Sequence, residues 1–264
     1  MRKTLIAILL ILVLAAGLAA CGGSPAQGDD PPDPLASSNH ELLRQFNDAT
    51  AQAVKLKPGY TKTRYTKITN LDFGARSNLS MVREGVYGFF GVESNGEGSM
   101  TYTVKKGESS DLMRASTLTM EDIEGISAAF DGAGGTVVTV RVKDGGTRWG
   151  GAGGNDPGSG TAKSAIDNGP LFWGVDGSPD YDHKTAQNFY YTINHTDGAG
   201  TKDIGETVTN AVFTARIDGD GRLTELACRL DMRVDVYHVK YSFFTLSDNS
   251  GEGTGEVTYS GFAY

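Results

Sequence analysis

The sequence predicts an α+β domain in which a curved antiparallel β-sheet, arranged as a half-barrel-like meander, packs on one or two N-terminal helices. Three observations predict this class. Residues 39–56 carry apolar side chains at steps of three and four, which is the period of an amphipathic helix. Residues 226–236 alternate between apolar and charged side chains, as expected for a strand with one buried face. Short polar turns, such as Asp218–Gly221, separate the C-terminal strands and favour antiparallel neighbours.

Residues 1–20 form a predicted secretory signal peptide. Arg2 and Lys3 precede an apolar run from Leu5 to Ala16, which is too short for a stable membrane span. The run ends in Leu-Ala-Ala followed by Cys21, which resembles the lipobox of bacterial lipoproteins. The resemblance implies cleavage before Cys21, a diacylglycerol on its sulfur, and an extracytoplasmic protein anchored by lipid to the bacterial cell membrane. The alternative is an ordinary signal peptide in which a cysteine stands at this position by chance.

Residues 21–38 are predicted to be the lipid anchor and a disordered tether, because they are rich in Gly, Pro, Ser and Asp and have no apolar period. Residues 39–264 suffice for a single α+β domain. The chain carries 24 Lys and Arg against 32 Asp and Glu, without a basic stripe, so we expect no nucleic-acid partner. The apolar neighbours of Cys228 indicate a buried, inert thiol rather than a reactive one.

The first predicted element is a helix from Asn39 to Leu56. Ser38 and Glu41 have the spacing of a capping box, and a Pro-Gly pair follows the end of the helix. A strand is predicted over Tyr60–Ile68. The segment Leu79–Phe90 has a helical apolar period and is predicted as a second helix, and Met100–Val104 as a short strand.

A β-hairpin with arms 124–130 and 136–144 is predicted next, followed by a short helix over 161–168. Further strands are predicted over 207–217, 226–236, 239–246 and 256–262. Glycine clusters at 132–135, 145–160 and 251–255 are predicted as turns or loops. The cluster at 145–160 is long enough for a mobile loop or an internal linker.

No motif for a catalytic nucleophile, a metalloprotease or a phosphate loop is present, so we predict no catalytic residue, cofactor or metal site and do not favour an enzyme. Asp218–Gly221 has the composition of a calcium loop but lacks its distant Glu, and a tight turn requires the same residues. Asp180, Asp182 and His183 could bind a metal, but a solvated acidic loop is the simpler interpretation.

Apolar side chains of the predicted sheet and helices are the candidate ligand-binding residues. Phe243 and Phe244 are adjacent in a predicted strand and face opposite sides, so one of them need not lie in the main core. Aromatic residues of this kind line a hydrophobic cavity in some proteins and fill the core in others. The candidates are Phe46, Val86, Phe89, Phe90, Leu230, Met232, Val234, Phe243 and Phe244.

The order of a helix, a strand and a C-terminal meander resembles the architecture of the LolA/LppX-like lipoproteins. The resemblance rests on residues 39–56 running into 60–68, and on the meander over 207–262. It implies a half-open sheet that wraps over helices and holds acyl chains or a lipid-linked cargo. The insertion at 145–160 departs from that architecture, and no residue motif for a lipid headgroup is present. Residues 118–144 and 213–262 are also similar to uncharacterised surface lipoproteins of clostridia-like bacteria, which implies a cell-surface address.

The sequence leaves functions from different classes open. The first is non-enzymatic binding of a hydrophobic or amphiphilic ligand. The alternative is a cell-surface or envelope interaction module with a filled core, which recognises a protein or glycan through its loops. A hydrolase with carboxylates far apart in the chain is the least favoured. A void between the sheet and the helices favours the ligand carrier, whereas a packed interior favours the interaction module.

Overall fold

The computed structural model describes residues 37–74, 83, 84, 87, 92–108, 112–150, 165–170, 199, 200, 203–241 and 244–264, without the side chains of 147–150, 199, 239, 241 and 244–247. They belong to one unit, Pro34–Tyr264. The predicted leader, Cys21 and the tether up to residue 36 lie outside the described residues. No helix among the described residues is long and apolar enough to cross a membrane.

The first element is α1 (Asn39–Leu56), with the bounds that the sequence predicts. The side chain of Ser38 accepts a hydrogen bond from the backbone N–H of Glu41, and the Glu41 carboxylate accepts one from the backbone N–H of Ser38. This capping box satisfies backbone groups that have no partner inside the helix. At the other end Lys57 adopts a left-handed conformation (φ 51°) and its N–H donates to the Ala53 carbonyl. The predicted helix and its cap are confirmed.

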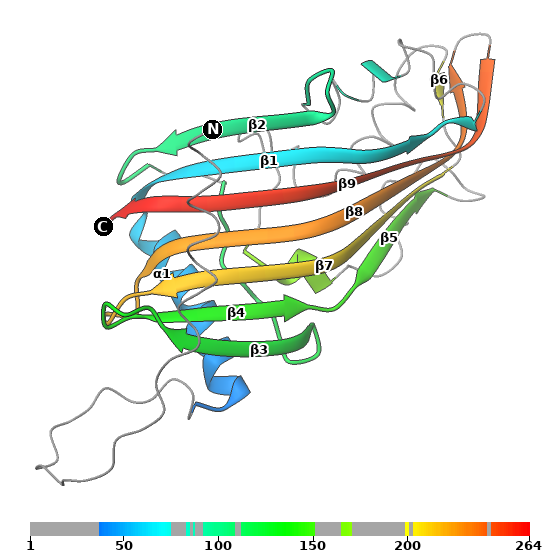
Figure 1. Cartoon of the computed structure of the whole chain (residues 1–264). Helices are drawn as coiled ribbons and strands as arrows, with labels where there is room; N and C mark the ends of the chain where they lie inside the picture. Colours follow the sequence, from blue (N-terminus) through cyan, green and yellow to red (C-terminus); the bar gives the residue numbers. More distant parts are fainter. Residues whose placement is uncertain are drawn as a thin grey trace, which may run out of the picture. The chain divides into compact units, whose positions relative to one another are not determined.

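In the described part of the chain, nine strands form a single antiparallel sheet (Figure 1). Seven of them follow the order β2-β1-β9-β8-β7-β4-β3, while β5 pairs with β7 and β6 pairs with β8. The sheet is open, with β2 and β3 at the ends of this order. The strands are β1 (Gly59–Asp72), β2 (Glu97–Val104), β3 (Ile123–Phe130), β4 (Thr136–Val142), β5 (Gly145–Gly150), β6 (Ala199–Gly200), β7 (Asp203–Ile217), β8 (Leu223–Tyr241) and β9 (Phe244–Ala263).

Two glycine-rich segments predicted as loops are strands instead. Residues 145–150 form β5, and residues 251–255 lie in the middle of β9. The predicted strand 239–246 is wrong, because its first residues belong to the end of β8 and its last ones to the start of β9, which continues through 256–262. At both glycine-rich segments a neighbouring backbone approaches closely. A Cβ on Gly146 would lie 2.8 Å from the Glu206 carbonyl oxygen, and one on Gly253 would lie 2.7 Å from that of Lys67. Glycine is required here by packing between strands rather than by a turn.

Two predicted helices lie only partly within the described residues. In the predicted second helix, Leu79–Phe90, the described residues Arg83, Glu84 and Tyr87 are helical, and the others are outside the description. In the predicted helix 161–168, residues Ala165–Asn168 form a short 3-10 helix, η3. The remainder of the predicted glycine-rich loop, 151–160, is also outside the described residues.

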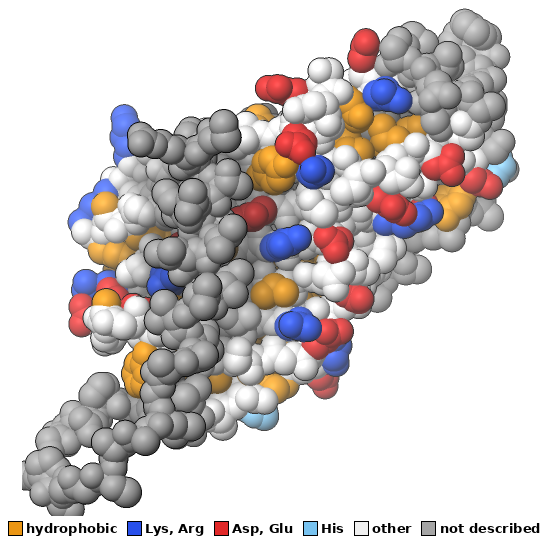
Figure 2. Space-filling view, viewed as in Figure 1, with side chains coloured by type: hydrophobic (Ala, Val, Ile, Leu, Met, Phe, Trp, Pro, Cys, Tyr) orange, Lys and Arg blue, Asp and Glu red, His pale blue; other side chains and the backbone are white. Residues whose placement is uncertain are grey.

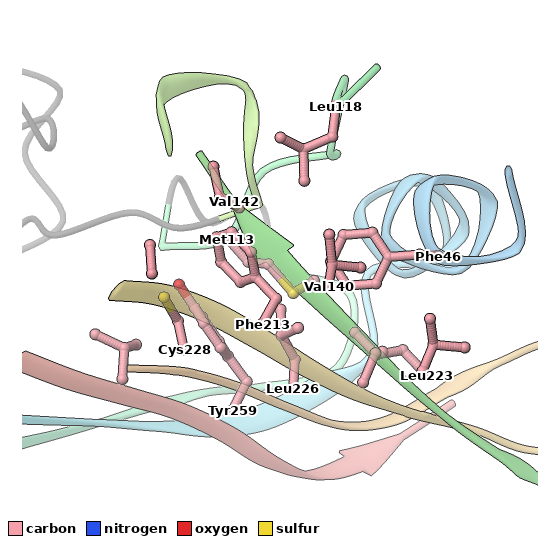
Figure 3. Close-up of a cluster of buried hydrophobic side chains, with 14 of the residues drawn as sticks. Phe46, Met113, Leu118, Val140, Val142, Phe213, Leu223, Leu226, Cys228 and Tyr259 are labelled. Carbon is pink, nitrogen blue, oxygen red and sulfur yellow. The ribbon is translucent and has the colours of Figure 1, made fainter. Parts of the chain in front are cut away.

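The hydrophobic core lies between α1 and the sheet. We call the face of the sheet on which α1 packs the inner face, and the opposite one the outer face. Figure 3 shows Phe46 projecting from α1 towards the strands, with its ring centroid 5.9 Å from that of Phe213 on β7. Tyr259 on β9 is fully buried, and its hydroxyl donates to the Leu112 carbonyl oxygen at 2.8 Å. The predicted burial of Cys228 is confirmed, and burial, followed by the nearby Glu256 carboxylate, raises the pKa of its thiol.

The outer face carries interleaved acidic and basic side chains (Figure 2). On β8 the predicted alternation is confirmed, because the apolar residues at even positions from 226 to 236 are buried while Arg229 and Arg233 are exposed. The Arg233 guanidinium pairs with Asp235 on its own strand and with Glu252 on β9. These exposed pairs contribute little to stability, so the two faces differ mainly in how much apolar surface they bury.

Candidate functional site

Three glycines of β9 lie in one row on the inner face. Gly251, Gly253 and Gly255 alternate with Glu252 and Thr254 along the strand. Because alternate residues of a strand point to the same face, this face of β9 carries no side chain from Gly251 to Gly255, over about 13 Å. We call these three residues the glycine strip.

Mostly apolar side chains of the two adjoining strands border the glycine strip. Each glycine has one register partner on β1 and one on β8, and the side chains of register partners lie on the same face. The strip and these partners form a furrow with a backbone floor and two walls. The walls are Thr66, Ile68 and Leu71 on β1, and Leu230, Met232 and Val234 on β8.

The furrow has little free space. It contains a cavity of about 10 Å³, lined among others by Met232, Val234 and Ile68. Such a volume holds about one water molecule, so an acyl chain can enter only if the lining side chains rearrange. Met232 is the most adaptable of them, since its side chain is unbranched and flexible. Around the furrow, the described residues therefore show a nearly filled interior rather than a wide void.

Two cationic side chains lie on the inner face of β1, beyond one end of the furrow. Lys62 is 0% exposed and Arg64 is 8% exposed. The Lys62 Nζ atom lies 5.5 Å from the centroid of the Tyr259 ring, which comes from its register partner on β9. The Arg64 Nη2 atom donates to the sulfur of Met100 on β2 at 3.2 Å. The inner face of β1 thus changes from cationic to apolar along its length, as Lys62 and Arg64 are followed by Thr66 and Ile68.

Burial changes the proton affinity of these groups. Loss of water by burial, and then repulsion by Arg64 and Arg114, lowers the pKa of Lys62 from 10.5 to about 7. Burial also lowers the pKa of the Arg64 guanidinium, although guanidinium groups stay charged in proteins. We call Lys62, Arg64 and Arg114 the cationic cluster. Each of these three cations makes further polar or electrostatic contacts within the protein.

A second concave feature lies beside α1. An open groove of about 680 Å³ runs between one side of the helix and residues 119–121. The Asn47 side-chain amide donates to the Leu118 carbonyl oxygen at 2.8 Å, whereas its buried oxygen has no hydrogen-bond partner in the described part of the chain. Charges of both signs border the groove. Its lining residues are His40, Leu43, Arg44, Asn47, Asp48, Thr119, Met120 and Glu121.

The structure separates the predicted ligand-binding residues into three groups. Phe46 and Leu230 belong to the closely packed core, with 0% and 1% exposure, and Leu230 is also the β8 wall residue opposite Gly255. Met232 and Val234 line the furrow. Val86, Phe89, Phe90 and Phe243 lie outside the described residues, and Phe244 is described only by its backbone at the start of β9.

Sequence reasoning missed the glycine strip and the cationic cluster. A search for apolar and aromatic side chains does not find the glycine strip, which has no side chains, or the cationic cluster, which is charged. The alternation of residues along β1 could have indicated the two cations on that strand. Strand alternation places Lys62 and Arg64 on the same face of β1 as Tyr60 and Ile68. An aromatic and an aliphatic residue on that face indicate that it is turned towards the core.

Within the described residues, no group of three or more His, Cys, Asp or Glu side chains is placed to hold a metal ion. The segment with Asp180, Asp182 and His183 lies outside the described residues. Asp218–Gly221 forms the turn between β7 and β8, where the Asp218 carboxylate accepts hydrogen bonds from the backbone N–H groups of Asp220 and Arg222. No protein-family model matches the chain, and neither a curated protein nor a solved structure matches it significantly.

Proposed function

We propose that this chain is an extracytoplasmic lipoprotein, anchored through lipid on Cys21, whose domain binds an amphiphilic ligand on the inner face of its sheet. The observation that carries this proposal is the glycine strip with apolar walls on both sides. An ordinary sheet fills its inner face with interdigitating side chains, whereas these three glycines place none there, and at Gly253 the Lys67 carbonyl oxygen of β1 lies where a Cβ would be. In this proposal the curved sheet acts as a half-open receptacle that is not enzymatic.

The energetics favour a chain-like apolar ligand. Each methylene group that leaves water on binding contributes about 0.8 kcal/mol, so a chain along the furrow gains several kcal/mol. The furrow is nearly filled, with a cavity of about 10 Å³, so the proposal requires that the ligand displace side chains as it enters, and a packed interior taken by itself favours the interaction module. Met232 has an unbranched, flexible side chain, which lowers the cost of this opening.

Photo-crosslinking in cells tests the proposal on the intact protein. The full chain is produced with its own leader in a bacterial host that is fed a long-chain fatty acid bearing a diazirine near its methyl end. Illumination followed by peptide mass spectrometry locates the labelled residues. We expect label on peptides that contain Ile68, Leu71, Met232 or Val234. The same spectra show whether the mature chain begins at a lipid-modified Cys21.

A matched pair of variants makes the test specific for the furrow. Gly251→Leu places a side chain on the furrow floor, where a Cβ meets only the flexible end of Leu71 at 3.3 Å. Gly205→Leu places the same side chain on β7, where a Cβ has no neighbour within 4 Å. We expect Gly251→Leu to lose the label and Gly205→Leu to keep it. Label that is absent from the wild type, or that is unchanged in Gly251→Leu, contradicts the proposal.

A second candidate function is an envelope interaction module, and the filled core together with the open groove beside α1 supports it. In this case the partner contacts Arg44 and Asp48 on the exposed side of the helix. A photoreactive amino acid introduced at Arg44 then crosslinks a protein of defined mass in the host envelope. A photoreactive amino acid at the exposed Lys55, near the other end of α1, does not.

A further inference from the structure

We infer that two copies of this chain associate through the free edge of β3, and that Phe130 of each copy packs into the groove beside α1 of the other. This surface lies outside the furrow, so the inference does not depend on the proposed function. It is drawn from the end position of β3 in the sheet, from the residues along its edge, and from where Phe130 and the groove lie relative to that edge.

β3 offers an edge for pairing with another molecule. It is the last strand in the order of the sheet, and the described structure pairs it with β4 alone. In the described part of the chain no residue of β3 has a polar contact beyond this pairing, whereas Tyr102 of β2, the strand at the other end, has further contacts. The backbone N–H and C=O groups on the edge of β3 away from β4 can therefore hydrogen-bond to an added strand.

This edge of β3 lacks the features that commonly keep edge strands apart. Proteins protect such edges with charged side chains or with proline. From Gly125 to Phe130 β3 has neither, and its register with β4 is regular over this stretch. The one charged residue of the strand, Glu124, lies at the register shift where β3 begins. An uncharged and regular edge favours pairing with a second strand.

The sequence of the edge is complementary to a copy of itself. A two-fold axis pairs two β3 strands antiparallel, with one central residue opposite its own copy. When Ser127 is central, Ile126 lies opposite Ala128, and Glu124 lies opposite the uncharged Phe130. No like charges meet across this seam, and the central pair consists of two small hydroxyl side chains. This symmetry leaves the inner faces of both copies on the same side of the joined sheet.

Phe130 supplies an apolar side chain at one end of the seam. It alternates with Ile126 and Ala128, which pack against the core, so it lies on the inner face. It is nevertheless 52% exposed, more than any other large hydrophobic side chain in the described residues. Burial of an aromatic ring is one of the main apolar contributions to an interface, so this side chain is suited to contact a partner.

The groove beside α1 lies at the other end of the seam. Residues 119–121 form its wall opposite the helix and directly precede β3, while Leu43 and Met120 give it an apolar lining. Figure 1 shows the N-terminal part of α1 behind β3, at this edge of the sheet. Because the strands are antiparallel, the end of one β3 lies beside the start of the other. Phe130 of each copy thus lies near the groove of its partner, and the same contact forms twice.

Cysteine crosslinking in cells tests the pairing on the full chain, produced with its own leader. Ser127→Cys places a thiol on the central pair, where the two Cα atoms lie about 5 Å apart, within the range of a disulfide. Thr139→Cys is the matched control, because Thr139 is the register partner of Ser127 on β4 and its two copies lie about 14 Å apart. Thr101→Cys makes the same change on β2, at the other edge of the sheet. Diamide oxidises the thiols, and non-reducing gels measure the dimer.

We expect a disulfide-linked dimer of Ser127→Cys, and only the background of the wild type from Thr139→Cys and Thr101→Cys. The wild type sets this background because it retains Cys21 and the buried Cys228. Background from Ser127→Cys, or an equal amount of dimer from Thr101→Cys, overturns the inference. A disulfide between Ser127→Cys and a protein of different mass also overturns it, because the edge then pairs with another partner.

A second substitution in the Ser127→Cys chain tests the contact of Phe130 with the groove. Phe130→Asp removes the ring and sets a carboxylate near Glu124 of the second copy, so we expect association to weaken about ten- to hundredfold. Val54→Asp is the control, since Val54 is an exposed apolar residue near the far end of α1, and it should leave the dimer unchanged. Thermal unfolding of the purified variants verifies that they are folded. Equal dimer from folded Phe130→Asp and Val54→Asp chains overturns the assignment of Phe130.

Discussion

At the scale of single residues, the protonation of Lys62 is set by what surrounds it. Its ammonium group is removed from water and lies on the face of β1 that also carries Arg64. Desolvation disfavours the charged form, and the neighbouring guanidinium groups add repulsion. The contact with the Tyr259 ring offsets part of the unfavourable free energy of burying the ammonium, since aromatic faces attract cations.

Replacement of this lysine by an apolar residue should stabilise the fold. Lys62→Met keeps the length of the side chain and removes the charge, and such replacements of buried charges are often neutral or stabilising by about 1–4 kcal/mol. The folded-state pKa is about 7 and the ordinary value is 10.5. Below pH 7 both the folded and the unfolded chain carry the proton, so the wild type bears the full cost of the buried charge.

Between pH 7 and 10.5 the folded chain has released a proton that the unfolded chain retains, so wild-type stability rises with pH through this window. The stability advantage of Lys62→Met should therefore be largest near pH 7 and shrink towards pH 10. Urea unfolding of both proteins across this range measures it. An advantage that is constant with pH contradicts the lowered pKa.

At the scale of secondary-structure elements, the glycines of β5 and β9 explain where sequence reasoning succeeds and fails. The bounds of α1 were predictable because its signals are local, namely the capping box at Ser38 and the apolar period. The faces of β8 were predictable because its alternation is regular. Clustered glycines indicate a turn in sequence, but Gly146 and Gly253 are needed because the backbone of a distant strand lies within 3 Å of their missing Cβ atoms. No local pattern contains that information.

The same geometry predicts unequal effects of alanine in the sheet. Gly253→Ala forces a Cβ to within 2.7 Å of a backbone oxygen, which cannot rotate away, so we expect a loss of about 1–3 kcal/mol in the free energy of unfolding. Gly251→Ala meets only the Leu71 side chain and Gly205→Ala meets nothing within 4 Å, so both should be close to neutral. Chemical denaturation of the three variants compares them. Equal stabilities would show that the strands can separate at Gly253 without cost.

At the scale of the whole molecule, the sheet has a central strand and two open edges. β8 pairs with β7 and β9 along most of its length, whereas β2 and β3 each pair with one neighbour in the described structure. The core on the inner face draws on α1 and on strands from both halves of the sheet (Figures 1 and 3). The antiparallel sheet and its packing on an N-terminal helix were predictable from the strand period and turns, but the order of the strands depends on contacts between distant segments.

This arrangement predicts a gradient of amide protection across the sheet. Amides of β8 from Leu226 to Arg233 should exchange most slowly with solvent, because strands cover both of its sides and its inner face is buried. Amides of β2 and β3 should exchange fastest among the paired strands of the monomer. Hydrogen exchange followed by mass spectrometry measures the gradient. Protection of β2 equal to that of β8 would mean that another strand covers this edge.

The position of β9 between β1 and β8 has a consequence for how the chain is made. β1 emerges from the ribosome soon after α1, yet one of its two neighbours is the last strand in chain order. Until β9 is synthesised, the furrow has walls without a floor, and the two strands that β9 will join have unpaired edges. Such long-range pairing makes folding slow compared with a sheet of sequential hairpins. The nascent chain can therefore complete its sheet only at the end of synthesis, which is compatible with the export that we propose.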